Sequence, residues 1–140
     1  MSESETGKPP DGSLAVGFRF RPHEHLRRPT DFRRVYDFRR SVSDGHIIVY
    51  AAPNNLPHLR IGFSVSRKVG PATYRNRLRR LYREAFRLTR HEMPAGLDLV
   101  LIPRPGGEQT LAGLLEALPK LVSQVARKLE RDAAKEAPPP

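Results

Sequence analysis

The pattern of apolar and polar positions divides the chain into six elements. Three short apolar runs predict strands: residues 46–52, which are β-branched and aromatic, residues 59–66, and residues 97–103, which form a short run typical of a buried strand. Three longer stretches repeat apolar residues every three or four positions and predict helices over residues 29–40, 74–90 and 111–131. In chain order the elements are α-β-β-α-β-α. This order predicts an α+β domain, an α/β sandwich in which helices pack on a sheet.

Proline and turn residues set the predicted boundaries. Thr30 is a candidate N-cap for the first helix, and Pro71 suits the first position of the second helix. The turn-forming residues 53–58 separate the first two strands, which predicts that these strands form an antiparallel hairpin. Pro119 lies inside the last helix and predicts a kink, because proline removes a backbone donor and clashes with the preceding turn.

The two ends of the chain differ from its middle. Residues 1–17 are polar and predict a disordered extension, and residues 132–140 end in a proline run that predicts a disordered tail. A single folded domain is expected over residues 18–131. The chain has no cysteine, no signal-peptide pattern and no apolar stretch near the roughly 20 residues that span a bilayer. A cytoplasmic protein without a membrane partner is therefore expected.

Charge changes this picture by indicating a polyanionic partner. The formal net charge is +10, and between Arg19 and Arg104 basic residues outnumber acidic ones by 19 to 7. Of the 25 basic residues, 20 are arginine, whose planar fork of donors suits phosphate and stacks on bases. The predicted folded region is thus the basic part, which favours nucleic acid over a membrane surface.

The charge is concentrated in the second predicted helix, in the stretch RNRLRRLYREAFR. At about 100° per residue, one arc is apolar and comprises Leu78, Leu81, Tyr82, Ala85 and Leu88. The opposite arc carries Arg75, Arg79, Arg80, Arg83, Arg87 and Arg90, with Asn76 among them and Arg77 at the edge of the apolar side. A solvated face normally alternates signs, so this arc predicts a polyanion-binding face. Arginines along a whole helix suit phosphates better than base edges, which favours structured RNA.

Two further features are ambiguous from the residues alone. Arg67 and Lys68 precede the arginine-rich helix, where backbone amides attract phosphate, but they also fit an ordinary strand-to-helix loop. Phe32, Tyr36 and Tyr50 could stack on bases, although their pattern favours core positions. The acidic residues of the basic region are scattered and form no catalytic motif, and no P-loop, HExxH or GxSxG is present. The chain itself is therefore not expected to catalyse a reaction.

The stretch RIGFSVSRKVGPATYRNRLRRLYREAFR, residues 60–87, resembles the protein subunit of bacterial ribonuclease P. A weaker similarity lies in HLRRPTDFRRVY, residues 25–36, and in the strand IIVYAA that follows. The resemblance covers roughly residues 18–128. It implies a domain akin to one in ribosomal proteins, with a left-handed β-α-β crossover that carries the Arg-Asn-Arg helix.

The resemblance also implies partners and a cofactor. Members of the family assist a large catalytic RNA, one protein per RNA, which cuts precursor tRNA with Mg²⁺ to give the mature 5′ end. The RNA is expected to hold the metal, so no catalytic residue and no protein-bound metal are predicted. No protein partner is predicted either.

Site residues follow from the resemblance position by position. The implied contacts to the catalytic RNA are Arg67, Lys68, Arg75, Asn76, Arg77, Arg79, Arg80 and Arg83. The implied contacts to the single-stranded 5′ leader, in a cleft between the first helix and the sheet, are Phe32, Tyr36, Tyr50 and Arg104. The resemblance therefore implies RNA-binding positions for the three aromatic residues, whereas their sequence pattern favoured core positions.

Other functions remain open on the residues. A ribosomal or other RNA-scaffold protein would use the same charge without a role in processing, and a nucleoid protein would bind duplex DNA equally well. A stand-alone nuclease would cut without added RNA. Three features depart from the family pattern, namely the N-terminal extension, Pro71 before the arginine-rich helix and Pro119 inside the last helix.

Overall fold

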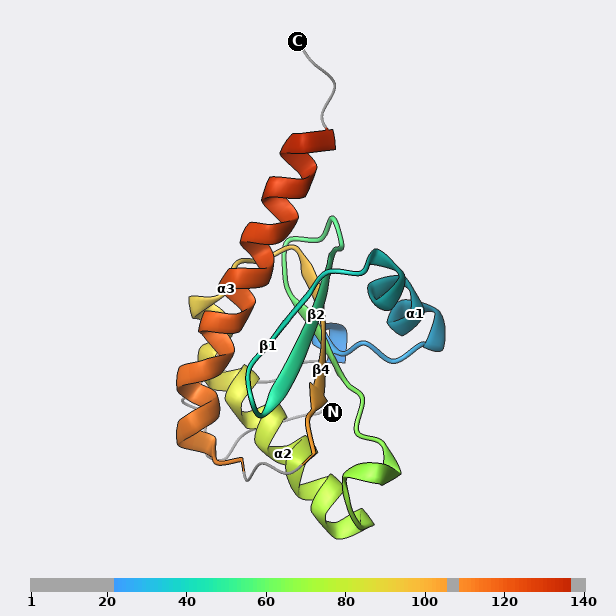
Figure 1. Ribbon diagram of the computed structural model, residues 1–140, viewed down its shortest axis with the longest axis vertical. Coiled ribbons are helices and arrows are strands. Elements are labelled where there is room, and N and C mark those ends of the chain that lie inside the picture. The colour runs from blue at the N-terminus through green and yellow to red at the C-terminus, as the bar shows by residue number, and fades with distance from the viewer. Residues whose placement is uncertain (1–21, 106–108, 137–140) are drawn as a thin grey trace.

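A four-stranded sheet with helices on both faces forms the centre of the molecule (Figure 1). The computed structural model describes residues 22–105 and 109–136, so the predicted N-terminal extension lies outside the described residues. The strands are β1 (Ser41–Ser43), β2 (Ile47–Pro53), β3 (Arg60–Phe63) and β4 (Leu97–Pro103). The helices are α1 (Pro29–Phe38), α2 (Ala72–Thr89) and α3 (Leu111–Glu136), with short 3-10 turns η2 (Pro22–Glu24), η3 (Arg67–Val69) and η4 (Arg90–Glu92). The predicted order is confirmed, with β1 as an additional short strand.

The sheet order β1-β2-β4-β3 corrects the predicted hairpin. The second and third strands run in opposite directions, but β4 lies between them, antiparallel to β2 and parallel to β3. The reason lies in β4, where six of the seven residues are buried. A strand of that composition is most stable in the middle of a sheet, with a neighbour on each edge. The parallel strands β3 and β4 are joined through α2, which gives the expected β-α-β crossover.

The helices divide between the two faces of the sheet. Figure 1 shows α1 on one side of the strands and α2 with α3 on the other. The larger core lies on the α2–α3 side and includes the fully buried Tyr82, Phe86 and Leu118. The smaller core lies under α1 and consists of Leu26, Val35, Ala52 and Val100.

Both ends of α1 differ from the prediction. The N-cap residue is Arg28, without a side-chain capping bond, and Pro29 takes the first helical turn, so Thr30 is not the cap. The helix ends at Phe38 because Arg39 adopts a left-handed conformation with φ 60° and its N–H binds the carbonyl of Tyr36. A left-handed residue directly after a helix closes its last turn.

The other two helices also start or end away from their predicted limits. Pro71 is the N-cap residue of α2 and not its first helical residue. Helix α3 passes through Pro119 as one element and continues beyond Arg131 to Glu136. Residues 132–136 of the predicted disordered tail are therefore helical, and Asp132 accepts a hydrogen bond from Arg40. Residues 137–140 lie outside the described residues.

Within residues 22–105 and 109–136, no helix combines the length and apolar character that crossing a bilayer requires.

Candidate nucleic-acid interface

Helix α2 buries one side and exposes arginines on the other. Its buried residues are Leu78, Tyr82, Ala85, Phe86 and Thr89. The helical periodicity did not predict the burial of Phe86 and Thr89, and it placed Leu81 and Leu88, which are only half-buried, on the apolar arc. The buried arc is shifted because α2 packs against α3 as well as against the sheet. This second contact could not be read from the periodicity of α2 alone.

Two arginines of the predicted cationic arc have acidic partners. Arg87 contacts Glu84 through Nη2 and Oε2 at 2.6 Å, and Arg90 pairs with the buried Glu24. The hydrogen bond from Arg87 lowers the pKa of Glu84 below its usual value. These two arginines therefore serve local structure, and neither belongs to the residues implied as RNA contacts.

The implied RNA contacts on α2 separate into two groups. Arg77, Arg80 and Arg83 are exposed, and no acidic side chain in the described part of the chain pairs with them. Arg75 and Arg79 are half-buried at the flank of the helix. Arg75 Nε donates to the Gly70 carbonyl at 3.1 Å, which fixes its side chain without neutralising it. Arg79 Nη1 donates to Asn76 Oδ1 at 3.0 Å in the same way.

The loop before α2 adds two more exposed cations, Arg67 and Lys68 in η3. The turn depends on Gly70, whose φ is 157° and at which a Cβ atom would lie 2.9 Å from the ring of Tyr74. The glycine therefore lets the loop close against the first turn of α2. We call the set of eight residues the arginine surface: Arg67, Lys68, Arg75, Asn76, Arg77, Arg79, Arg80 and Arg83.

The arginine surface continues onto the segment before α1. His25 pairs with Ile61 at the outer edge of β3. Burial, Arg27 and Arg83 lower the pKa of His25, which places both cations near the imidazole. Positive charge therefore extends from α2 past His25 to Arg27.

Aromatic side chains gather on the opposite face of the sheet. Tyr36 of α1 and Tyr50 of β2 meet edge to face, with ring centroids 5.2 Å apart and an interplanar angle of 87°. These two rings and Phe32 are half-buried against the smaller core. These three side chains are thus partly exposed to solvent. Tyrosine tolerates such a position because its ring is apolar and its hydroxyl group is polar. We call Phe32, Tyr36 and Tyr50 the aromatic surface.

Gly62 makes room for Phe32. A Cβ atom at Gly62 would lie 2.5 Å from Phe32 Cζ, so only glycine lets the ring rest on β3. The glycine of the RIGF stretch therefore positions an aromatic side chain that lies far away in the sequence.

Arg104 lies at the end of the same face. Its backbone N–H donates to the His46 carbonyl at 2.9 Å, which extends the β2–β4 ladder by one pair. Because side chains alternate along a strand, Arg104 shares the face of Ile102 and Val100, and Val100 pairs with Tyr50. This alternation assigns the exposed Arg104 to the sheet face that carries the aromatic surface.

Asp98 joins α1 to the sheet, a role that the sequence pattern did not predict. Its carboxylate is fully buried and accepts hydrogen bonds from Arg60 Nε at 2.8 Å, from Asn54 Nδ2 at 2.9 Å and from Arg34 of α1. Burial by itself raises the pKa of Asp98, but these donors outweigh it and hold the pKa below its usual value. In the sequence, the sign of this role is a charged residue inside the apolar run LDLVLIP.

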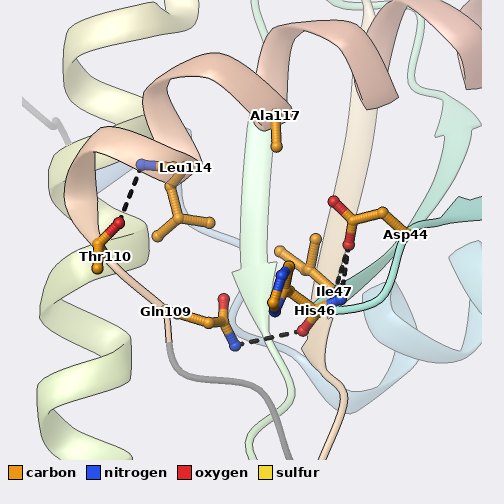
Figure 2. Close-up of a pocket in the computed structure, with 8 residues that line it drawn as sticks. Asp44, His46, Ile47, Gln109, Thr110, Leu114 and Ala117 are labelled. Carbon is orange, nitrogen blue, oxygen red and sulfur yellow. Dashed lines mark hydrogen bonds between the residues drawn. The ribbon is translucent and has the colours of Figure 1, made fainter.

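A pocket of about 140 Å³ lies where β2 begins and α3 starts (Figure 2). Gln109 is buried beside it, accepts a hydrogen bond from the Tyr82 hydroxyl at 3.0 Å and donates to the His46 carbonyl at 3.3 Å. Asp44 accepts from the backbone N–H groups of His46 and Ile47. Gln109 thus joins α2 to the segment before β2, and Asp44 closes the turn that leads into β2. Within the described ranges, no three His, Asp or Glu side chains group as metal ligands would.

Comparison with known proteins finds one family along nearly the whole described region. Residues 20–126 match the Ribonuclease P family. The "Ribonuclease P protein component" of Syntrophobacter fumaroxidans is 45% identical over 92 residues, which cover 65% of this chain and 77% of that protein. The protein of the same name from Alkaliphilus metalliredigens is 39% identical over 101 residues, 71% of this chain and 91% of that protein.

Solved structures give the same result. The ribonuclease P protein from Thermotoga maritima superimposes with a TM-score of 0.66 at 32% identity, covering 72% of this chain and 96% of that chain. The Staphylococcus aureus protein gives a TM-score of 0.64 at 29% identity, covering 72% and 94%.

Proposed function

The chain belongs to the ribonuclease P protein family, and on that premise we propose how its two surfaces serve the enzyme. The chain is the protein component of ribonuclease P, an accessory subunit of a ribonucleoprotein endoribonuclease. Its partners are the RNA subunit and precursor tRNA, whose 5′ leader the enzyme removes. The observation that carries the proposal is the family match, which spans both surfaces.

The arginine surface binds the RNA subunit. Its exposed members Arg77, Arg80 and Arg83 supply guanidinium groups that no acid in the described residues neutralises. Uncompensated arginines release counterions from an RNA backbone and supply affinity that falls with salt. Arginines spread along a helix suit phosphate contacts on structured RNA.

The aromatic surface holds the single-stranded leader. Single-stranded RNA is recognised by stacking its bases on aromatic side chains, with cations on its phosphates. Tyr36 and Tyr50 are half-buried, so each ring keeps an edge or face open, and Arg104 provides a cation on the same sheet face. Leader binding distinguishes precursor from mature tRNA, because only the precursor carries a leader.

The RNA subunit carries the catalytic Mg²⁺, and this chain acts through binding. Cations of the arginine surface lower repulsion between RNA and substrate phosphates, so the holoenzyme should need less Mg²⁺ than the RNA alone. We further propose one protein per RNA, a cytoplasmic location, and a single RNA-binding domain over residues 18–131, with α3 extending it to Glu136.

Cleavage of precursor tRNA at low Mg²⁺ tests the proposal. Three reactions contain the protein alone, the candidate RNA subunit alone, and both together. Cleavage at the mature 5′ end only in the combined reaction is expected. Cleavage by the protein alone would identify a nuclease instead. Tight RNA binding without any stimulation would identify an RNA-scaffold protein.

A matched pair of variants localises the effect. Arg80→Ala with Arg83→Ala should reduce stimulation, whereas Arg127→Ala with Arg131→Ala, which removes two exposed arginines of α3, should not. Equal loss in both pairs would show that net charge matters and that the arginine surface has no special role.

A further inference from the structure

The outer side of α1 carries a shallow hollow that neither surface uses. It is lined by Thr30, Arg33, Arg34, Asp37 and Phe38. Phe38 is 43% exposed and is the only large apolar side chain in the described residues that is exposed. Phe38 lies three positions after the buried Val35, yet among the described residues the side chains packed on the smaller core are Phe32, Tyr36, Tyr50 and Ile102. The smaller core therefore does not explain its position.

Charge around the hollow is mainly positive. Arg33 and Arg39 are exposed and have no acidic partner among residues 22–105 and 109–136. Arg34 is bound on one side to Asp98 and the Pro53 carbonyl, yet its side chain remains 42% exposed. Asp37 is the only acid that lines the hollow.

This combination fits single-stranded RNA better than a protein. A single exposed apolar residue is common and by itself indicates nothing. An exposed ring among arginines, however, offers both a stacking face for a base and cations for the adjoining phosphates. A second copy of this chain, with net charge +10, would be repelled by the same arginines.

The hollow lies within reach of RNA on the aromatic surface. Phe38 is the last residue of α1, two positions after Tyr36, and two positions rotate a helix by about 200°. The two rings thus lie on opposite flanks of one helix end, about one helix diameter apart, or 10–12 Å. After Phe38 the chain passes Arg39 and enters β1, where Ser41 pairs with Tyr50. An RNA strand leaving Tyr36 and Tyr50 around this helix end meets Arg39 and then Phe38.

We propose that the outer face of α1 is a second single-strand site, which binds leader nucleotides farther from the cleavage site than those on the aromatic surface. Phe38 stacks on a base, and Arg33 and Arg39 contact phosphates. This inference rests on the proposed leader binding by the aromatic surface and extends its path.

Leader length tests the inference in the holoenzyme. Precursor tRNAs with a graded series of leader lengths, and mature tRNA, are titrated with holoenzyme containing each protein variant. Phe38→Ala should weaken the binding of precursor tRNA about fivefold or more, which corresponds to the lower end of the range for one stacked base. The effect should appear only above a threshold leader length. Phe38→Tyr should retain affinity because it keeps the ring. Arg33→Gln should lower the salt dependence for long leaders, and Arg127→Gln, on α3, is the matched control.

The outcomes separate the second site from the first. Tyr36→Ala should weaken binding already with shorter leaders. If Phe38→Ala leaves the affinity unchanged at every leader length, or weakens the binding of mature tRNA equally, the proposal of a second site is wrong. If Phe38→Ala acts with long leaders only while Tyr36→Ala is silent, the second site stands and leader binding by the aromatic surface fails. Thermal melting of the Phe38→Ala protein checks that the exposed ring is dispensable for folding.

Discussion

The arginine surface and the aromatic surface depend on the rest of the molecule to different degrees. Arg77, Arg80 and Arg83 project from α2, while the opposite side of that helix fixes it to the larger core. Tyr36 and Tyr50, in contrast, are themselves packed on the smaller core, and Tyr36 belongs to α1, which Asp98 ties to the sheet. Changes at these three exposed arginines should therefore affect binding alone. Changes on the aromatic surface should affect binding and folding together.

The largest effect should come from Asp98. Asp98→Ala leaves Arg34 and Arg60 without their shared carboxylate, and breaking a buried ion pair by removing one partner costs about 3–5 kcal/mol. Because both arginines keep some exposure, a loss of about 3 kcal/mol in the free energy of unfolding is expected, measured by urea denaturation. Asp37→Ala, at an exposed position of α1, should stay within about 0.5 kcal/mol. Equal midpoints for both variants would show that α1 is held by apolar packing alone.

Removing one ring of the aromatic surface should have the next largest effect. Tyr36→Ala should weaken binding of precursor tRNA to the holoenzyme by about 1–3 kcal/mol, the range for one stacked base, and should hardly change binding of mature tRNA. Tyr36→Phe keeps the stacking ring and should retain most of the affinity. Equal loss for precursor and mature tRNA would contradict leader binding, and a large fall in stability would favour a core role.

Substitutions on the arginine surface should change how the affinity for the RNA subunit depends on salt. Arg80→Ala with Arg83→Ala should reduce the slope of log affinity for the RNA subunit against log salt by about 1–2, since each lost phosphate contact removes about 0.7–0.9. The urea midpoint should not move, because both side chains are exposed and unpaired in the described structure. An unchanged slope would place the RNA-binding face elsewhere. A shifted urea midpoint would show that these two arginines also stabilise the fold, as the residues of the aromatic surface are expected to do.

The smallest effect should come from His25, which lies beside the arginine surface. Burial, Arg27 and Arg83 lower its pKa below the usual 6.5, so the unfolded chain binds this proton more readily than the folded chain. The free energy of unfolding should therefore fall as pH decreases below about 6.5 and level off above it. His25→Gln should remove this part of the pH dependence. Parallel curves for both proteins between pH 5 and 7 would show that His25 does not contribute.

Much of the fold could be predicted from local patterns. The strand over residues 97–103 has the bounds expected from its apolar run, and α1 and α2 form where the helical period indicated. Strand pairing could not be predicted in the same way. The turn at residues 53–58 favoured a hairpin, but β4, distant in sequence, has more apolar surface to bury and takes the place between β2 and β3.

The candidate site likewise has a part that local sequence patterns predict and a part that depends on the folded chain. The cationic side of α2 follows from helical geometry, because side chains three and four positions apart share a face whatever the helix packs against. The status of Phe32, Tyr36 and Tyr50 did not follow, since a half-buried ring and a buried ring have the same sequence pattern. The partners of Arg87 and Arg90 and the role of Asp98 also required the folded chain.

The sequence by itself determined the element order, the family resemblance and the sign and location of the charge, because these depend on neighbours within one helix or strand. The tertiary structure decided that β4 separates β2 from β3, that Gly62 admits the Phe32 ring, and that Asp98 fixes α1 over the sheet. Those features arise from contacts between residues far apart in the chain. Such contacts form only when buried apolar surface and buried charge find partners across the fold.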